Sequence, residues 1–114
     1  MQFQATAVSA GQRRTACAVV GVYEHAEMTE AAHALDRRCR HALSRWLRRG
    51  DFHGRLAEVQ MLPDLAGVTA ERVLLVGLGE RRRFNRRSYR KALAAAAQWL
   101  VKSAARDATV HLSQ

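Results

Sequence analysis

The residues of this sequence best suited to chemistry lie in one stretch, RVLLVGLGERRRFNRRSYRKA, residues 72–92. A continuous Val/Leu run enters a Gly-x-Gly turn at Gly77 and Gly79, and three arginines follow after a single glutamate. Glycines after a buried strand let a backbone approach a phosphate group, and guanidinium groups bind phosphate in a bidentate manner. The stretch therefore has three interpretations: a phosphate-binding loop, a nucleic-acid surface, or a strand-to-helix corner on a basic protein.

Neither of the common phosphate-binding motifs is complete at this turn. A dinucleotide fingerprint requires a third glycine for close helix packing, and Arg82 occupies that position. A Walker-type loop requires Gly-Lys-Ser/Thr after the first glycine, and no such triplet follows. We therefore interpret Gly77 and Gly79 as a turn that closes a buried strand, where glycine provides backbone freedom.

Positive charge is concentrated directly after the turn. Residues 81–91 carry seven positive charges in eleven residues, with Phe84 and Tyr89 between them. Charges near the positive end of a helix dipole are unfavourable and attract an anion. We interpret Phe84 as a hydrophobic staple rather than a platform for base stacking. The candidate anion- or nucleic-acid-binding residues are Arg81, Arg82, Arg83, Arg86, Arg87, Arg90 and Lys91, and a solvated surface is the alternative.

Other catalytic or metal-binding constellations are incomplete. The five histidines show no His-x-x-x-His spacing, and His33 and His41 are too far apart on one expected helix to share an ion. The serines lack a Gly-x-Ser-x-Gly elbow, and Cys17 lies inside an apolar strand, where a thiol is inert. We assign no catalytic, cofactor-binding or metal-binding residue and expect no enzymatic activity from this chain alone.

Length and composition predict a single cytoplasmic domain over residues 1–114, with no membrane partner. The chain is 48% hydrophobic, and it has no apolar run near the roughly 20 residues that span a bilayer. Its start lacks the basic-then-apolar order of a secretory signal, and Cys17 and Cys39 suit free buried thiols. A net charge of +9 attracts polyanions, although arginines on solvated helix faces explain it equally well.

The spacing of apolar residues predicts two helices and five strands. One helix covers 29–50, with Thr29 as its N-cap and Gly50 as its stop, and a second covers 86–104 after Asn85. Strands are expected over 2–9, 15–23, 56–62, 72–79 and 108–112. The order is β-β-α-β-β-α-β, which predicts an α/β fold with a mixed β-sheet flanked by helices.

In combination, these segments resemble the N-terminal domain of the bacterial leucyl (cytosol) aminopeptidases. The strand ACAVVGVYE, the helix end LRRGDFHG and the stretch RVLLVGLGERRRFNRRSYRKA follow one another in the order of that family. The resemblance covers essentially all 114 residues. It implies a non-catalytic N-terminal domain of macro-domain-like topology, joined in the parent protein to a C-terminal peptidase domain that is absent here.

The resemblance also implies the chemistry of the parent protein. Members remove N-terminal amino acids, preferably leucine, from peptides with two divalent metals, zinc or manganese, held in the C-terminal domain. That domain's Asn-Thr-Asp-Ala-Glu-Gly-Arg-Leu signature is absent here, so no metal ligand is carried over to this chain. The implied partners are the peptidase domain of the same chain, other copies in a hexamer, and DNA, which some bacterial members bind.

Three alternatives of other classes stay open at this point. A free-standing macro-like module would bind ADP-ribose or a nucleotide, but such modules use a second glycine-rich loop, and this sequence has one Gly-x-Gly. A free-standing basic module would bind nucleic acid through residues 81–91. A domain that only supports assembly would bind neither.

Overall fold

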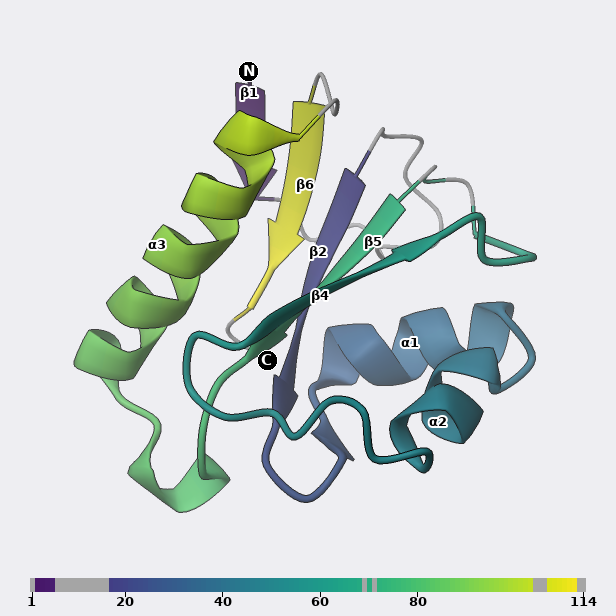
Figure 1. Ribbon diagram of the computed structural model, residues 1–114, viewed down its shortest axis with the longest axis horizontal. Helices are drawn as coiled ribbons and strands as arrows, with labels where there is room; N and C mark the ends of the chain where they lie inside the picture. Colours follow the sequence, from purple (N-terminus) through teal and green to yellow (C-terminus); the bar gives the residue numbers. More distant parts are fainter. Residues whose placement is uncertain (1, 6–16, 69, 71, 104–106, 113–114) are drawn as a thin grey trace.

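The computed structural model describes residues 2–5, 17–68, 70, 72–103 and 107–112. One mixed sheet runs through the centre of the molecule in the order β1-β6-β2-β5-β4, and β3 pairs with the end of β2 (Figure 1). β1, β6, β2 and β5 run parallel to one another, whereas β4 is antiparallel to β5 and forms one edge, and β3 is antiparallel to β2. The strands are β1 (Gln2–Ala5), β2 (Cys17–Tyr23), β3 (Glu27–Met28), β4 (Val59–Pro63), β5 (Arg72–Gly77) and β6 (Asp107–His111).

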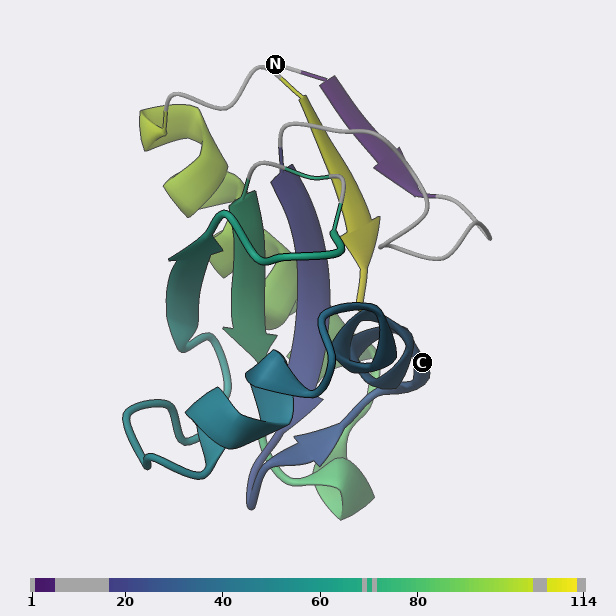
Figure 2. The ribbon, with the colours of Figure 1, turned by 90° about the vertical axis from the view of Figure 1, so that its right-hand side faces the viewer.

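Helices cover both faces of the sheet. α1 (Glu30–Arg38) and α2 (Ala42–Leu47) pack on one face, and α3 (Arg86–Lys102) packs on the other (Figures 1 and 2). A short 3-10 turn, η1 (Arg81–Arg83), connects β5 to α3. The predicted α/β class, with a mixed sheet between helices, is confirmed, and the macro-domain-like topology stays a prediction.

The central strands are buried on both faces, which explains their continuous apolar sequence. Every residue of β2 is buried, and its side chains alternate between the two helical layers. Val20 and Val22 join the α1 and α2 side, whereas Val19 joins the α3 side. Burying a valine or leucine side chain contributes about 1.5 to 3 kcal/mol each, so β2 and β5 together anchor the fold.

The single helix expected over 29–50 is wrong, because the chain breaks between α1 and α2. Arg40 and His41 have left-handed backbones, with φ of 56° and 64°. The buried Asp36 carboxylate accepts hydrogen bonds from the Ser44 N–H at 2.8 Å and the Ser44 hydroxyl at 2.9 Å. The Asp36 carbonyl also accepts from the His41 N–H at 2.7 Å. These bonds satisfy backbone groups that an unbroken helix would satisfy internally.

The apolar stripe survives the break because both helices face the same layer. Leu35, Leu43 and Leu47 are all buried in one cluster, which is the stripe the sequence predicted. Both predicted N-caps are confirmed, since the side chains of Thr29 and Asn85 accept backbone N–H bonds at 3.2 Å and 3.0 Å.

Several strand boundaries differ from the expected ones: β5 ends at Gly77 rather than residue 79, and β6 covers Asp107–His111 rather than 108–112. The predicted order β-β-α-β-β-α-β differs from the observed order in two ways. It does not contain the two-residue strand β3, and it counts α1 and α2 as one helix. β4 begins at Val59 rather than residue 56 and includes Pro63, which an edge strand tolerates because it has a free side. Of the strand expected over 2–9, Gln2–Ala5 is observed and the rest lies outside the described residues.

None of the helices in the described ranges is long and apolar enough to cross a membrane.

The pKa of Asp36 reflects the contacts at the helix break. Burial alone raises the pKa of this carboxyl, but hydrogen bonds from the Ser44 backbone, His41 and the Ser44 hydroxyl outweigh burial and hold it below the ordinary 3.8. A group with a depressed pKa in the folded state stabilises the fold above its unfolded pKa, and this stabilisation is lost as the pH falls through its folded pKa.

We predict that Asp36→Ala lowers the free energy of unfolding by about 2 to 3 kcal/mol at pH 7, because Ser44 loses its buried acceptor. The difference between wild type and variant should stay constant above the unfolded pKa of 3.8 and shrink as the pH falls through the lower folded-state pKa of Asp36. Urea unfolding at a series of pH values measures this difference. A difference that stays constant below pH 3.8 as well would contradict the role given to the carboxylate.

Candidate anion-binding surface

The Gly77–Gly79 turn is filled by protein backbone rather than open to a ligand. A Cβ atom on Gly77 would collide with the carbonyl of Arg55, so glycine is required for close packing. Three consecutive amides of the turn donate to backbone carbonyls at 2.6 to 3.0 Å: Gly77 to Glu58, Leu78 to Val22, and Gly79 to Gly54. Because these donors are occupied, the turn cannot use them to hold a phosphate group, and its interpretation as a structural corner is confirmed.

The three arginines after the turn form η1 and are exposed. Arg81 forms an ion pair with Glu27 of β3 at 3.0 Å, and its guanidinium carbon lies 5.8 Å from the centre of the Tyr23 ring. Arg83 pairs with Glu80 at 3.3 Å. Such exposed pairs contribute little to stability. They still offset two of the seven positive charges in the segment.

Four further basic residues occupy the outer face of the first turns of α3. Arg86 and Arg90 are four residues apart, as are Arg87 and Lys91, so each pair lies on the same side of the helix. All four are exposed, and none forms an ion pair with another residue that the structure describes. The first turn of α3 contains no acidic residue.

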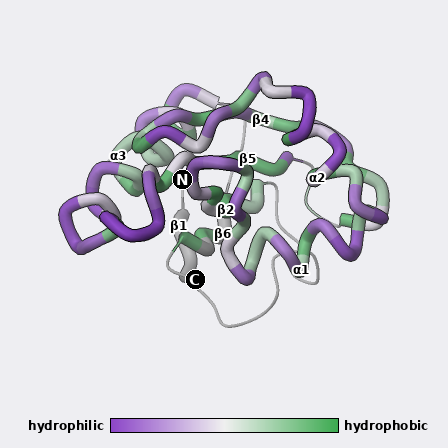
Figure 3. Tube along the Cα trace, turned by 90° about the horizontal axis from the view of Figure 1, so that it is seen from below, coloured by the Kyte–Doolittle hydropathy of each residue, from purple (hydrophilic) through white to green (hydrophobic). Residues whose placement is uncertain are grey.

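The positions of these four residues are electrostatically unfavourable. Their positive charges repel one another, and they lie near the positive end of the α3 dipole. Like charges four residues apart destabilise a helix by about 0.2 to 0.5 kcal/mol per pair, and the positive end of the dipole adds to this. Viewed from the end of the molecule where η1 lies, the chain at the start of α3 is strongly hydrophilic (Figure 3). We call residues 81–91 the basic segment.

Phe84 packs the basic segment against the sheet. The Phe84 ring meets the Tyr23 ring edge-on, with centroids 5.6 Å apart and planes at 86°. Asn85 then caps α3 by accepting from the Ser88 N–H and hydroxyl. Phe84 therefore serves packing, as the sequence indicated, and its ring partner is on β2 rather than on the helix.

A group of Asp36, His41 and Ser44, which sequence reasoning missed, lies at the helix break. Its residue types resemble a hydrolytic triad, but Ser44 donates to Asp36 and His41 also bonds to Asp36 at 3.1 Å. No bond connects the hydroxyl to the imidazole ring, so the group has no nucleophile paired with a base. Its role is the structural one described above.

The remaining reactive groups are also unsuited to catalysis or metal binding. Both cysteines are buried, and burial raises the pKa of the Cys17 thiol to about 11, which keeps it protonated at neutral pH. Among the described residues, no three His, Cys, Asp or Glu side chains gather closely enough to hold a metal ion. These residues therefore do not fit a two-metal centre, and we derive no catalytic step within this chain.

Because the Gly77–Gly79 turn is closely packed, replacing Gly77 should destabilise the fold. Gly77→Ala should lower the free energy of unfolding by about 3 kcal/mol, because the new methyl group meets fixed backbone. Gly50→Ala is the matched control: Gly50 has φ of 85° but open space around it, so only about 1 kcal/mol of backbone strain is expected. Equal losses in denaturant unfolding would show that close packing at Gly77 is unimportant.

Comparison with known proteins places the chain in a family. The model of the N-terminal domain of the cytosol aminopeptidase family matches residues 19–114. A Halorhodospira halophila protein named "Probable cytosol aminopeptidase" is 45% identical over 114 residues, which cover 100% of this chain and 23% of that protein. A protein of the same name from Alkalilimnicola ehrlichii is 44% identical over 98 residues, which cover 86% of this chain and 20% of that protein.

A solved structure shows the same fold. A mutant of tomato leucine aminopeptidase matches 100% of this chain and 23% of its own, with a TM-score of 0.72 and 24% sequence identity. The chain thus spans less than a quarter of the length of each of these relatives. Because the family model covers residues 19–114, the chain belongs to the cytosol aminopeptidase family and matches its N-terminal domain.

Proposed function

We propose that this chain is the non-catalytic N-terminal domain of a cytoplasmic, metal-dependent aminopeptidase, a hydrolase that removes N-terminal amino acids from peptides. The observation that carries the proposal is the match to the family's N-terminal domain, together with relatives of more than four times the length. The described residues contain no cluster that suits a metal ion. Catalysis and two divalent metals, zinc or manganese, therefore belong to a C-terminal peptidase domain of the same chain.

Within that protein, the domain would serve assembly and regulation. The family resemblance supports a homo-hexamer, with a macro-domain-like N-terminal domain on each subunit. The alternative of a free-standing ADP-ribose or nucleotide module has less support, because the amides of the Gly77–Gly79 turn are engaged by backbone carbonyls.

The basic segment supports a second role, the binding of DNA or another polyanion. The observation that favours it is the set of exposed charges without acidic partners among the described residues, namely Arg82, Arg86, Arg87, Arg90 and Lys91. Phosphate groups would relieve their mutual repulsion and interact favourably with the N-terminus of α3. Arg81 and Arg83 would add to the field despite their pairing with Glu27 and Glu80.

The peptidase proposal is tested on the complete product of the gene. We expect that protein to hydrolyse leucine p-nitroanilide, to lose activity on chelation and to regain it with zinc or manganese. Residues 1–114 alone should be inactive under the same conditions. A stop codon directly after Gln114, or a longer product that is inactive with either metal, would contradict the proposal.

The DNA proposal is tested by reversing charge at the start of α3. Arg86→Glu/Arg87→Glu should weaken binding of a short fluorescent DNA duplex by about tenfold or more, and should flatten its salt dependence between about 50 and 200 mM NaCl. The same variant should raise the free energy of unfolding by about 1 kcal/mol, because acidic residues suit a helix N-terminus. Fluorescence anisotropy and urea unfolding measure the two effects.

The matched control is Arg37→Glu/Arg38→Glu in the last turn of α1, on the other face of the sheet. It changes the net charge equally but should retain DNA binding and lose stability. Equal weakening by both variants would show that binding follows net charge alone. No binding by the wild type at low salt would end the proposal.

A further inference from the structure

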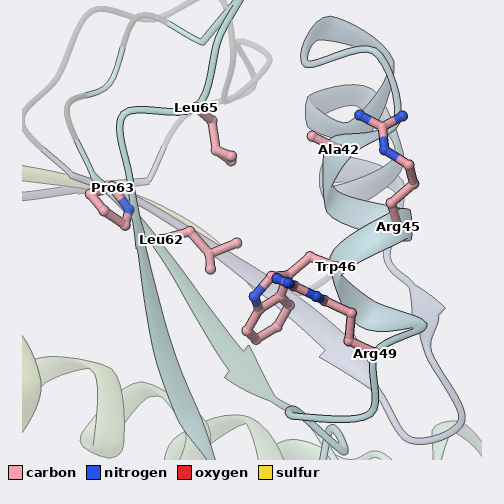
Figure 4. A pocket seen from close by; sticks show the side chains of 7 residues that line it. All are labelled: Ala42, Arg45, Trp46, Arg49, Leu62, Pro63 and Leu65. Carbon is pink, nitrogen blue, oxygen red and sulfur yellow. The ribbon is translucent and has the colours of Figure 1, made fainter.

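A groove outside the basic segment lies between α2 and the edge strand β4 (Figure 4). Its volume is about 550 Å³, and its walls are mainly apolar. Trp46 points from α2 toward Leu62 of β4, and Leu65 closes the space from the loop after β4. Trp46 is half-buried and packs against Phe52, with ring centroids 6.3 Å apart. The indole is thus held in place while part of it stays exposed.

Two arginines in the lining of the groove favour a ligand that carries negative charge. Arg45 and Arg49 are four residues apart, and no acidic residue lines the groove. The Arg45 guanidinium donates to the Arg40 carbonyl at 2.9 Å, which fixes it at the rim. Arg49 forms no ion pair with any residue that the structure describes. Guanidinium groups beside an apolar surface suit carboxylates that flank an apolar side chain.

The edge strand adds a reason to expect an extended occupant. β4 pairs with β5 on one side and with no other described strand. An exposed strand edge can pair with an extended peptide, while pockets beside it receive alternate side chains. The same groove of a second copy is disfavoured as the occupant, because its Arg45 and Arg49 would repel the arginines of this groove.

We propose that this groove docks an extended acidic peptide segment of a partner protein. One aliphatic or aromatic side chain of the segment lies against Trp46, Leu62 and Leu65, and flanking carboxylates pair with Arg45 and Arg49. The groove and the basic segment are separate places on the molecule. The groove adjoins α2 on one face of the sheet, whereas the basic segment leads into α3 on the other face.

The test uses the complete protein and the fluorescein-labelled peptide Ser-Glu-Asp-Leu-Phe-Glu-Asp-Ser. Saturable binding by anisotropy is expected, and Arg45→Glu/Arg49→Glu should weaken it by about tenfold or more. Two control peptides should bind poorly, one with lysine in place of the acidic residues and one with Gly-Gly in place of Leu-Phe. Trp46→Ala should also weaken binding, but the charge-reversed pair is the decisive variant because both of its residues are exposed.

Arg37→Glu/Arg38→Glu is the matched control, because it makes the same change in net charge at exposed residues that neither line the groove nor belong to the basic segment. It should change affinity by less than about threefold. Equal weakening by both pairs would overturn the proposal, because the peptide would then bind through net charge. No saturation, or a groove covered in the complete protein by its own remaining chain or by a second copy, would also overturn it.

Discussion

The fold depends on burying two parallel strands on both faces. β2 is wholly buried and β5 nearly so, and each needs an apolar layer above and below it. α1 with α2 supplies one layer and α3 the other, so their apolar stripes are fixed by the sheet. Every strongly charged segment is then forced to the perimeter, since the interior has no room for unpaired charge. The basic segment lies at a corner because β5 before it and the buried side of α3, whose first turns belong to the segment, are committed to the core.

Close packing of backbone at that corner positions the basic segment. The loop around Gly54 approaches the end of β2 so closely that a Cβ atom there would collide with the carbonyl of Tyr23. The same loop accepts the Gly79 N–H through the Gly54 carbonyl. Phe84 adds an aromatic contact with Tyr23. This closely packed corner fixes where η1 and α3 begin.

Features set by neighbouring residues could be predicted from the sequence. The predicted features include the Thr29 and Asn85 caps, the strand expected over 72–79 and observed over Arg72–Gly77, and the apolar stripes. They depend on local periodicity and on side chains a few residues apart. The break between α1 and α2 was not predicted, because Arg40 and His41 adopt left-handed backbones and no glycine stands there to signal them. Its cause, the bond between Asp36 and Ser44, is a tertiary contact within an otherwise regular apolar pattern.

The same distinction applies to the candidate site. The seven charges are visible in the sequence, but the partner of Arg81 is Glu27, which lies 54 residues earlier. The carbonyls that occupy the glycine turn likewise come from β2 and from the loop before β4. Sequence reasoning therefore located the residues and could not say which of them are neutralised or which amides are engaged.

The positive charges at the start of α3 that have no acidic partner among the described residues lower the stability of the helix, and this cost is relevant to function. Arg86, Arg87, Arg90 and Lys91 repel one another and the helix dipole, although acidic residues at the same exposed positions would stabilise α3. Nothing in the packing requires arginine there, since the buried side of α3 consists of Ala92, Ala96 and Leu100. A bound anion would offset this cost, which is the physical reason for proposing the basic segment as a binding surface.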